Sequence, residues 1–178
     1  MELVFGSKAE VGGEVWIPIS TGDNKPVFKQ FNNVIIDEVN SDTIRFNLQD
    51  KTLDSYDEDL KVAAKENKID WFGRDVSDRV IDNAYRSPAF EGTLTTVPLR
   101  SGGDDDEVRV KCFDHDKNAI EFGDLKEGTE CSVVVELKRL WFVKRNFGPE
   151  WYSIQIKTHK VPEPDHDPYD GYLFQDDE

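Results

Sequence analysis

The sequence predicts a small, mainly β-sheet barrel with a helical insert and an acidic C-terminal tail. Two observations carry this prediction. Short runs of alternating apolar and polar residues lie on both sides of a stretch in which apolar residues recur at helical spacing. After Val161 the chain carries seven acidic residues and no lysine or arginine. A length of 178 residues suits one domain with appended segments.

The first strands are expected before residue 50. Ile44, Phe46 and Leu48 alternate with polar residues, which is the pattern of a strand with one buried face. Residues 34–36 form an apolar run, and the polar residues 40–42 between the two segments favour a turn. We therefore expect two strands joined by a short turn.

A helical insert is predicted over residues 55–86. Ser55 and Glu58 match a capping box, with the serine at the N-cap and the glutamate three residues later. Apolar residues at helical spacing follow, which predicts a helix over 56–68 and a second helix that ends at Ser87-Pro88. These residues are Leu60, Ala63 and Ala64 in the first helix, and Val76, Val80, Ile81 and Ala84 in the second.

From residue 108 onward the pattern is that of β-strands. Residues 108–113, 131–138 and 151–157 alternate, and residues 140–152 predict a hairpin interrupted at 146–149. If Tyr152, Ile154 and Ile156 face the core, Trp151 and Lys157 face solvent. By the same alternation we expect three outward residues on the first run: Arg109, Lys111 and Phe113.

The charge is unevenly distributed along the chain. The formal net charge is −15, of which the tail holds −7. Residues 138–160 carry six basic residues and only Glu150 as an acid, a net charge of +5, which leaves −13 for residues 1–137. A uniformly acidic protein repels nucleic acid. The basic segment directly before the tail makes one local binding face possible.

The sequence contains no convincing motif for catalysis or metal binding. None of the three histidines lies in a nucleophile elbow, zinc-site or phosphate-loop motif. Asp104-Asp105-Asp106-Glu107 reads as a solvated loop rather than a metal site. Asp114–Asn118 resembles the start of a calcium loop but lacks the later glycine and glutamate, so a hairpin turn is expected. We predict no enzymatic activity, no cofactor and no metal, with a metal-dependent nuclease as the enzyme alternative.

Cellular context follows from what the sequence contains. Cys112 and Cys131 lie on separate apolar runs, which predicts buried free thiols in a reducing compartment. The first residues show no charged region followed by an apolar one, and no run reaches the roughly 18 apolar residues of a membrane span. An intracellular protein is therefore expected.

Nucleic-acid binding is the function that the residue pattern favours. Residues 137–152 interleave basic and aromatic side chains. Proteins that bind single strands use cations along the phosphates and flat side chains under the bases, at about 1–3 kcal/mol per stacked base. Aromatic residues of a hairpin also fill cores, so part of this set is expected to be buried.

The C-terminal half resembles a known protein family. The order of a strand ending near Phe113-Asp114, then Gly128-Thr129, then residues 137–142, then 147–152, then an acidic tail is similar to the OB-fold single-stranded DNA-binding proteins of podovirus-like phages and large eukaryotic DNA viruses. The resemblance implies a five-stranded Greek-key OB-type barrel that coats single strands in replication, recombination and repair. It also implies a tail that recruits the replicative polymerase and helicase or primase, and that occupies the protein's own DNA cleft.

These considerations give one set of candidate residues. We expect residues 1–161 to form the binding domain, and residues 162–178 to be a disordered tail. The predicted DNA contacts are Arg109, Lys111, Lys138, Arg139, Trp141, Lys144, Arg145, Phe147, Trp151 and Lys157. The predicted partner-binding residues of the tail are Tyr172, Leu173, Phe174, Asp176, Asp177 and Glu178.

The expected partners and location follow the same resemblance. They are single-stranded DNA, the replication proteins, and a second copy in a homodimer, at the site of viral or phage DNA replication in the cytoplasm of an infected cell or in the nucleus. Two alternatives stay open. One is an acidic interaction protein such as a DNA mimic, and the other is an RNA-binding OB-fold protein.

Overall fold

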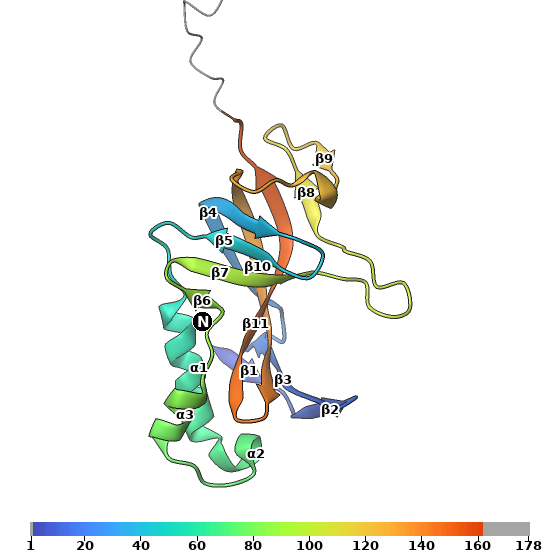
Figure 1. Cartoon of the computed structure of the whole chain (residues 1–178). Coiled ribbons are helices and arrows are strands. Elements are labelled where there is room, and N and C mark those ends of the chain that lie inside the picture. Colours follow the sequence, from blue (N-terminus) through green and yellow to red (C-terminus); the bar gives the residue numbers. More distant parts are fainter. Residues whose placement is uncertain (1, 162–178) are drawn as a thin grey trace, which may run out of the picture.

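A closed five-stranded barrel forms the centre of the computed structural model, which describes residues 2–161 (Figure 1). The strands follow the order β4–β5–β7–β11–β10, and β10 closes the ring by pairing with β4. β7 and β11 pair in parallel, and the other barrel pairs are antiparallel. The barrel strands are β4 (Val27–Val39), β5 (Ile44–Asn47), β7 (Thr93–Pro98), β10 (Glu130–Val143) and β11 (Asn146–Thr158). The predicted mainly β fold with a Greek-key OB-type barrel is confirmed; the predicted disordered tail lies outside the described residues.

Side chains that alternate along the barrel strands fill its interior. Val133, Val135 and Leu137 of β10 are fully buried, as are Ile44 and Phe46 of β5. Burial of each such side chain contributes about 1.5–3 kcal/mol. The two cysteines are buried free thiols, as predicted. Desolvation raises the pKa of Cys112 to about 11 and that of Cys131 to about 12, so both are protonated at neutral pH.

β10 and β11 extend beyond the barrel and carry a second, smaller layer of strands. β3 (Glu14–Thr21) pairs with β10 from Arg139 to Phe142, and β1 (Leu3–Phe5) and β2 (Ala9–Val11) pair with β3. At the other end of β11, β8 (Lys111–Phe113) adds in parallel and β9 (Ala119–Ile120) pairs with β8. The remaining short elements are β6 (Ala89–Phe90) and a 3₁₀ turn at Phe122–Asp124.

Three helices lie between β5 and β7 in the chain. They are α1 (Asp54–Glu66), α2 (Lys68–Phe72) and α3 (Asp78–Ala84). The predicted capping box is wrong, because α1 begins at Asp54 with Leu53 as its N-cap, which places Ser55 inside the first turn. Leu53 is buried and anchors that end of the helix in the core. None of the helices among residues 2–161 is long and apolar enough to cross a membrane.

The helices lie beside the far end of the β10–β11 hairpin (Figure 1), and an aromatic cluster fixes them there. Phe147 of β11 stacks on Phe142 of β10, and its ring meets Phe72 and Tyr85 edge-on at 5.3 Å. The Tyr85 hydroxyl donates to Asp57 of α1 at 2.6 Å. The backbone N–H of Arg86 donates to the Phe147 carbonyl at 2.8 Å. The hairpin and the insert therefore share one core.

Two β-bulges interrupt the β10–β11 ladder. Val134 pairs with Gln155 and Val135 with Ser153, which leaves Ile154 without a partner on β10. Leu137 pairs with Trp151 and Arg139 with Glu150, which leaves Lys138 unpaired in the same way. Because successive strand residues face opposite sides, each extra residue exchanges the faces of the residues beyond it. Ile156 and Trp151 therefore both face the core although their numbers differ in parity.

Gly148 offers a test of how tightly the insert packs on the hairpin. A Cβ at this position would lie 2.1 Å from the Arg86 carbonyl oxygen and 3.2 Å from Cζ2 of Trp141. Since backbone must move to admit it, we expect Gly148→Ala to destabilise the fold by about 1–3 kcal/mol. A protein of this size loses roughly 2–4 °C in melting temperature per kcal/mol. Gly123→Ala is the matched control, because nothing lies within 4 Å of its Cβ. Equal melting temperatures for the two variants would contradict this packing.

Candidate nucleic-acid interface

The outer face of β4, β10, β11 and β8 carries three rows of side chains. The register places Phe28 beside Glu136 and Tyr152 in the first row. The second row is Gln30, Val134, Gln155 and Lys111, and the third is Ser132, Lys157 and Phe113, with Asn32 beside it. None of these positions is among the fully buried residues of the core. Four strands thus present one continuous polar and aromatic surface.

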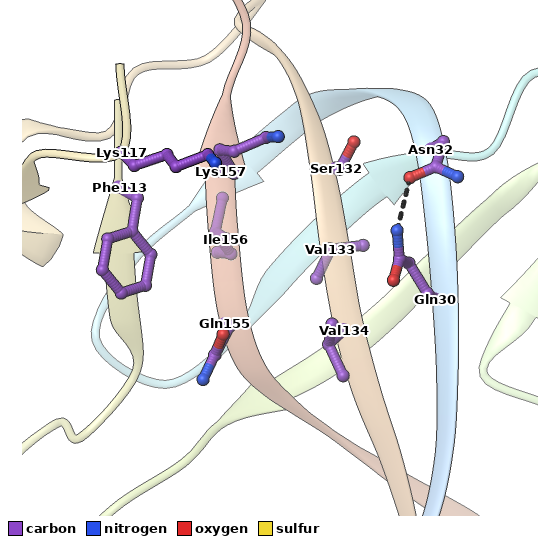
Figure 2. A pocket seen from close by; sticks show the side chains of 10 residues that line it. All are labelled: Gln30, Asn32, Phe113, Lys117, Ser132, Val133, Val134, Gln155, Ile156 and Lys157. Carbon is purple, nitrogen blue, oxygen red and sulfur yellow. Dashed lines mark hydrogen bonds between the residues drawn. The ribbon is translucent and has the colours of Figure 1, made fainter. Parts of the chain in front are cut away.

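A groove of about 350 Å³ runs over the second and third rows (Figure 2). Figure 2 shows Phe113 and Lys117 on one side of it and Gln30 and Asn32 on the other, with β10 and β11 forming the floor. The Gln30 side-chain amide donates to the side-chain Oδ1 of Asn32 at 2.8 Å. Lys157 lies at the end of the groove near Lys117. The groove therefore combines an aromatic ring, two ammonium groups and several amide groups.

The turn between β8 and β9 holds Lys117 at the groove. Asp114 accepts hydrogen bonds from the backbone N–H groups of Asp116 and Asn118, both at 2.9 Å. The hydrogen bonds from Asn118 lower the pKa of Asp114 below its ordinary value, so the carboxylate stays charged within the turn. These bonds form the hairpin turn expected at 114–118. No group of three or more histidine, cysteine or acidic residues that could hold a metal occurs among the described residues.

Tyr152 and Lys138 form a second contact on this face. Lys138 Nζ lies 4.9 Å from the centroid of the Tyr152 ring, within the range of a cation–π interaction. Burial raises the pKa of the Tyr152 phenol, and Glu150 raises it further, so the ring stays neutral. The first row also exposes Phe28, whose side chain is 51% accessible. Two aromatic rings, Phe28 and Tyr152, therefore lie in the first row, which adjoins the second row of the groove.

The end of β11 is tied to β10 at the rim of the groove. His159 Nε2 lies 2.9 Å from the Ser132 hydroxyl, and His159 Nδ1 lies 3.2 Å from a carboxylate oxygen of Glu130. The His159 backbone N–H also donates to the Glu130 carbonyl at 2.9 Å. These contacts orient the strand that carries Lys157 and fix the point at which the chain leaves the barrel.

Two predicted stacking residues are buried instead. Trp151 is 1% exposed, so the expectation that it faces solvent is wrong, and Phe147 is buried in the aromatic cluster. The bulge at Ile154 is the physical reason why Trp151 is buried, because it turns Tyr152 outward and Trp151 inward. Trp141 is partly buried and packs against Gly148. None of the three lines the groove.

The predicted basic residues divide into separate groups. Lys111 and Lys157 belong to the rows, Arg109 is exposed two residues before Lys111, and Lys138 is exposed on the same face. Arg139 is not free to contact phosphate, because it forms an ion pair with Glu150 and lies 4.8 Å from the Trp16 ring. Lys144 and Arg145 form the hairpin tip, at the opposite end of the molecule from β8 (Figure 1).

Sequence reasoning missed part of the groove. Gln30, Asn32, Gln155 and Lys117 line it, and none of them was among the predicted contacts. Phe28, Gln30 and Asn32 alternate with buried Val27 and Phe31, so the period-two pattern of β4 was the available signal. Lys117 carried no such signal, because its position depends on the turn.

Comparison with known proteins gives one family and a set of solved structures. A sequence model of the family described as "Family of unknown function (DUF5871)" matches residues 32–176. No protein with a curated function matches the chain. A solved structure of a single-stranded DNA-binding protein from bacteriophage Enc34 has 11% sequence identity and a TM-score of 0.48, and the match covers 93% of this chain and 95% of that one.

A second structure of the same phage protein, in complex with single-stranded DNA, has 11% identity and a TM-score of 0.47 over 90% of this chain and 97% of that one. A structure of the phage protein with a C-terminal truncation has 12% identity and a TM-score of 0.46, and the match covers 92% of this chain and 98% of that one. Any function assigned to this chain therefore has to rest on its own residues. By the match over residues 32–176, the chain belongs to the family described as DUF5871.

Proposed function

We propose that this protein binds single-stranded DNA, without sequence preference and without enzymatic activity, across the outer face of β4, β10, β11 and β8. The observation that carries the proposal is the groove in which Phe113 lies beside Lys157 and Lys117, with Lys111 in the adjoining row. Flat rings accept any base, and lysines follow the phosphates. Bases paired in a duplex offer no face to such rings, so the arrangement favours single strands.

The acidic remainder of the protein restricts where a strand can bind. With a net charge of −15, most of the surface repels phosphate. The basic residues of this outer face must therefore act together, and they hold the strand to one path. Arg109, exposed two residues before Lys111, and Lys138, exposed beside Tyr152, extend the path from the groove toward the first row.

The cellular role proposed is the protection of exposed strands during viral or phage DNA replication, recombination and repair. The acidic tail is proposed to act in two ways. Its acids compete with DNA for the groove face, next to which the chain leaves the barrel at His159. Its terminal segment, Tyr172 to Glu178, recruits the replicative polymerase and the helicase or primase.

A salt titration tests the phosphate contacts. Each contact contributes a slope of about −0.7 to the dependence of log affinity on log salt, which corresponds to roughly fivefold in affinity at 0.1 M salt. We expect Lys111→Ala with Lys157→Ala to weaken binding about 25-fold and to flatten the slope by about 1.4. Fluorescence anisotropy of labelled oligo-dT measures both quantities. Lys8→Ala, an exposed lysine before β2, is the control. An unchanged slope would contradict the proposed path.

Phe113 tests base stacking. Phe113→Leu keeps an apolar side chain against the core but removes the flat ring, so we expect oligo-dT affinity to fall by about 1 kcal/mol or more, roughly fivefold. Phe90→Leu is the matched control, because Phe90 is exposed on β6 and does not line the groove. The same titrations with oligo-U and duplex DNA distinguish the alternatives. Binding of oligo-U as tightly as oligo-dT, or more tightly, would favour an RNA-binding protein, and no binding of any strand would favour a DNA mimic.

Removal of residues 162–178 tests the tail. A tethered segment competes at an effective concentration on the order of millimolar. We expect the truncated protein to bind oligo-dT several-fold more tightly at low salt and equally at high salt, where charges are screened. A full-length variant with the seven tail acids changed to amides should behave like the truncation. If either change weakened binding, the proposed competition would be wrong.

A further inference from the structure

A second groove lies between the helical insert and the hairpin tip, away from the proposed DNA face. It has a volume of about 410 Å³. Its floor is apolar and consists of Phe72, Val76, Ile81 and Phe142. Val80 of α3 lies at the same groove and is 50% exposed, which is unusual for a valine beside an apolar floor. The floor thus offers an uncovered apolar surface to an aromatic or aliphatic side chain.

Three cations surround this floor. Arg74 follows α2, and Lys144 and Arg145 form the hairpin tip. Within residues 2–161, none of the three takes part in an ion pair, whereas Arg45, Lys65, Lys68, Arg100 and Arg139 all do. Lys144 also adopts a left-handed backbone with φ of 54°, a conformation that glycine and asparagine take more easily. A concentration of unpaired positive charge therefore lies around an apolar groove in a protein of net charge −15.

The end of this chain has the complementary chemistry. Tyr172, Leu173 and Phe174 are three consecutive apolar side chains, and Asp176, Asp177 and Glu178 follow them directly. Asp170 precedes them. The tail segment has apolar side chains bounded by acidic residues, and the groove has an apolar floor bounded by cations. The two are therefore complementary in charge and alike in hydrophobicity. Within residues 2–161, the acidic run 57–59 also has apolar neighbours, Tyr56 and Leu60, but it is part of helix α1.

The length of the intervening chain favours a second copy as the source of the segment. The groove lies at the hairpin tip, whereas the last described residues leave at the far end of β11 (Figure 1). β11 spans 13 residues, and a strand rises about 3.3 Å per residue, so the two points are separated by roughly 40 Å. Ten residues lie between Val161 and Tyr172, so eleven residue-to-residue steps separate the two. Fully extended, this stretch reaches at most about 40 Å, and a flexible chain of that length spans only about 18 Å on average.

We infer that the Tyr172–Glu178 segment of one copy docks in the α2–α3 and hairpin-tip groove of a second copy of this chain. Phe174 and its apolar neighbours cover the floor, and the terminal acids pair with Arg74, Lys144 and Arg145. Because the groove and the origin of the tail lie at opposite ends, the contact is head-to-tail and leaves a groove and a tail free for further copies. The acids nearer the barrel remain beside the DNA face of their own copy.

Sedimentation velocity of the full chain without DNA, over a wide range of protein concentration, tests the inference. We expect the wild-type protein to associate beyond the monomer as concentration rises. Two variants should reduce the association constant at least tenfold: Lys144→Glu with Arg145→Glu, and Asp176→Lys with Asp177→Lys. A mixture of these two variants should associate again, because each supplies a charge partner for the other. A wild-type protein that stays monomeric, or a mixture that does not associate, would overturn the inference.

A matched pair of substitutions tests the apolar contact between the tail and the groove. Val80→Asp should weaken association at least tenfold, whereas Val62→Asp on α1, with nearly the same exposure of 51%, should leave it unchanged. Equal effects of the two changes would refute docking at this groove. Lys126→Glu controls for net charge alone, since this lysine is exposed and lies outside the groove. Since DNA is absent, these results do not depend on whether the proposed function is correct.

Discussion

The β10–β11 ladder is the interaction on which the rest of the structure depends. Its strands of 14 and 13 residues pair over nearly their whole length, and every other strand of the described fold attaches to one of them directly or through one neighbouring strand. β4 pairs with the first part of β10 and β7 with the middle of β11 to close the barrel, β3 brings the N-terminal strands to β10, and β8 pairs with the end of β11. The helical insert packs on the hairpin through Phe147. Loss of this ladder would separate all of these parts.

The two bulges determine what the ladder presents on each side. Without the extra residue at Ile154, one alternation would run the length of β11 and place Trp151 outside. With it, Trp151 and Phe147 fill the core while Tyr152, Gln155 and Lys157 remain on the outer face. A bulge costs some hydrogen bonds between the two strands but increases their twist. This twist lets the long strands form part of the barrel and continue beyond it as a hairpin. The division between core and outer face therefore originates in backbone register rather than in residue type.

This also explains how far sequence reasoning could reach. The strands, the insert and the barrel followed from apolar periodicity, which is a local property, and Lys111, Lys157 and Phe113 were correctly expected on the outside. Trp151 and Tyr152 were assigned to the wrong faces because a bulge leaves no mark in the periodicity of one strand; it exists only relative to the partner. Arg139 was predicted to be free because its partners Glu150 and Trp16 lie on other strands. Lys117 and the amides of β4 reach the groove only through tertiary pairing.

The distribution of charge now has a structural meaning. Six basic residues of segment 138–160 suggested one basic face, yet the ladder separates them along roughly 40 Å. Lys157 joins Lys111 and Lys117 at one end, Arg139 is neutralised in the middle, and Lys144 and Arg145 meet Arg74 at the other end. A single strand of nucleic acid and a short acidic segment are both anionic, but they differ in what accompanies the charge. The first groove offers amides and a partly exposed ring for bases, whereas the second offers an apolar floor without amide side chains other than Asn146. One extended hairpin can therefore serve two anionic ligands without making them compete for the same site.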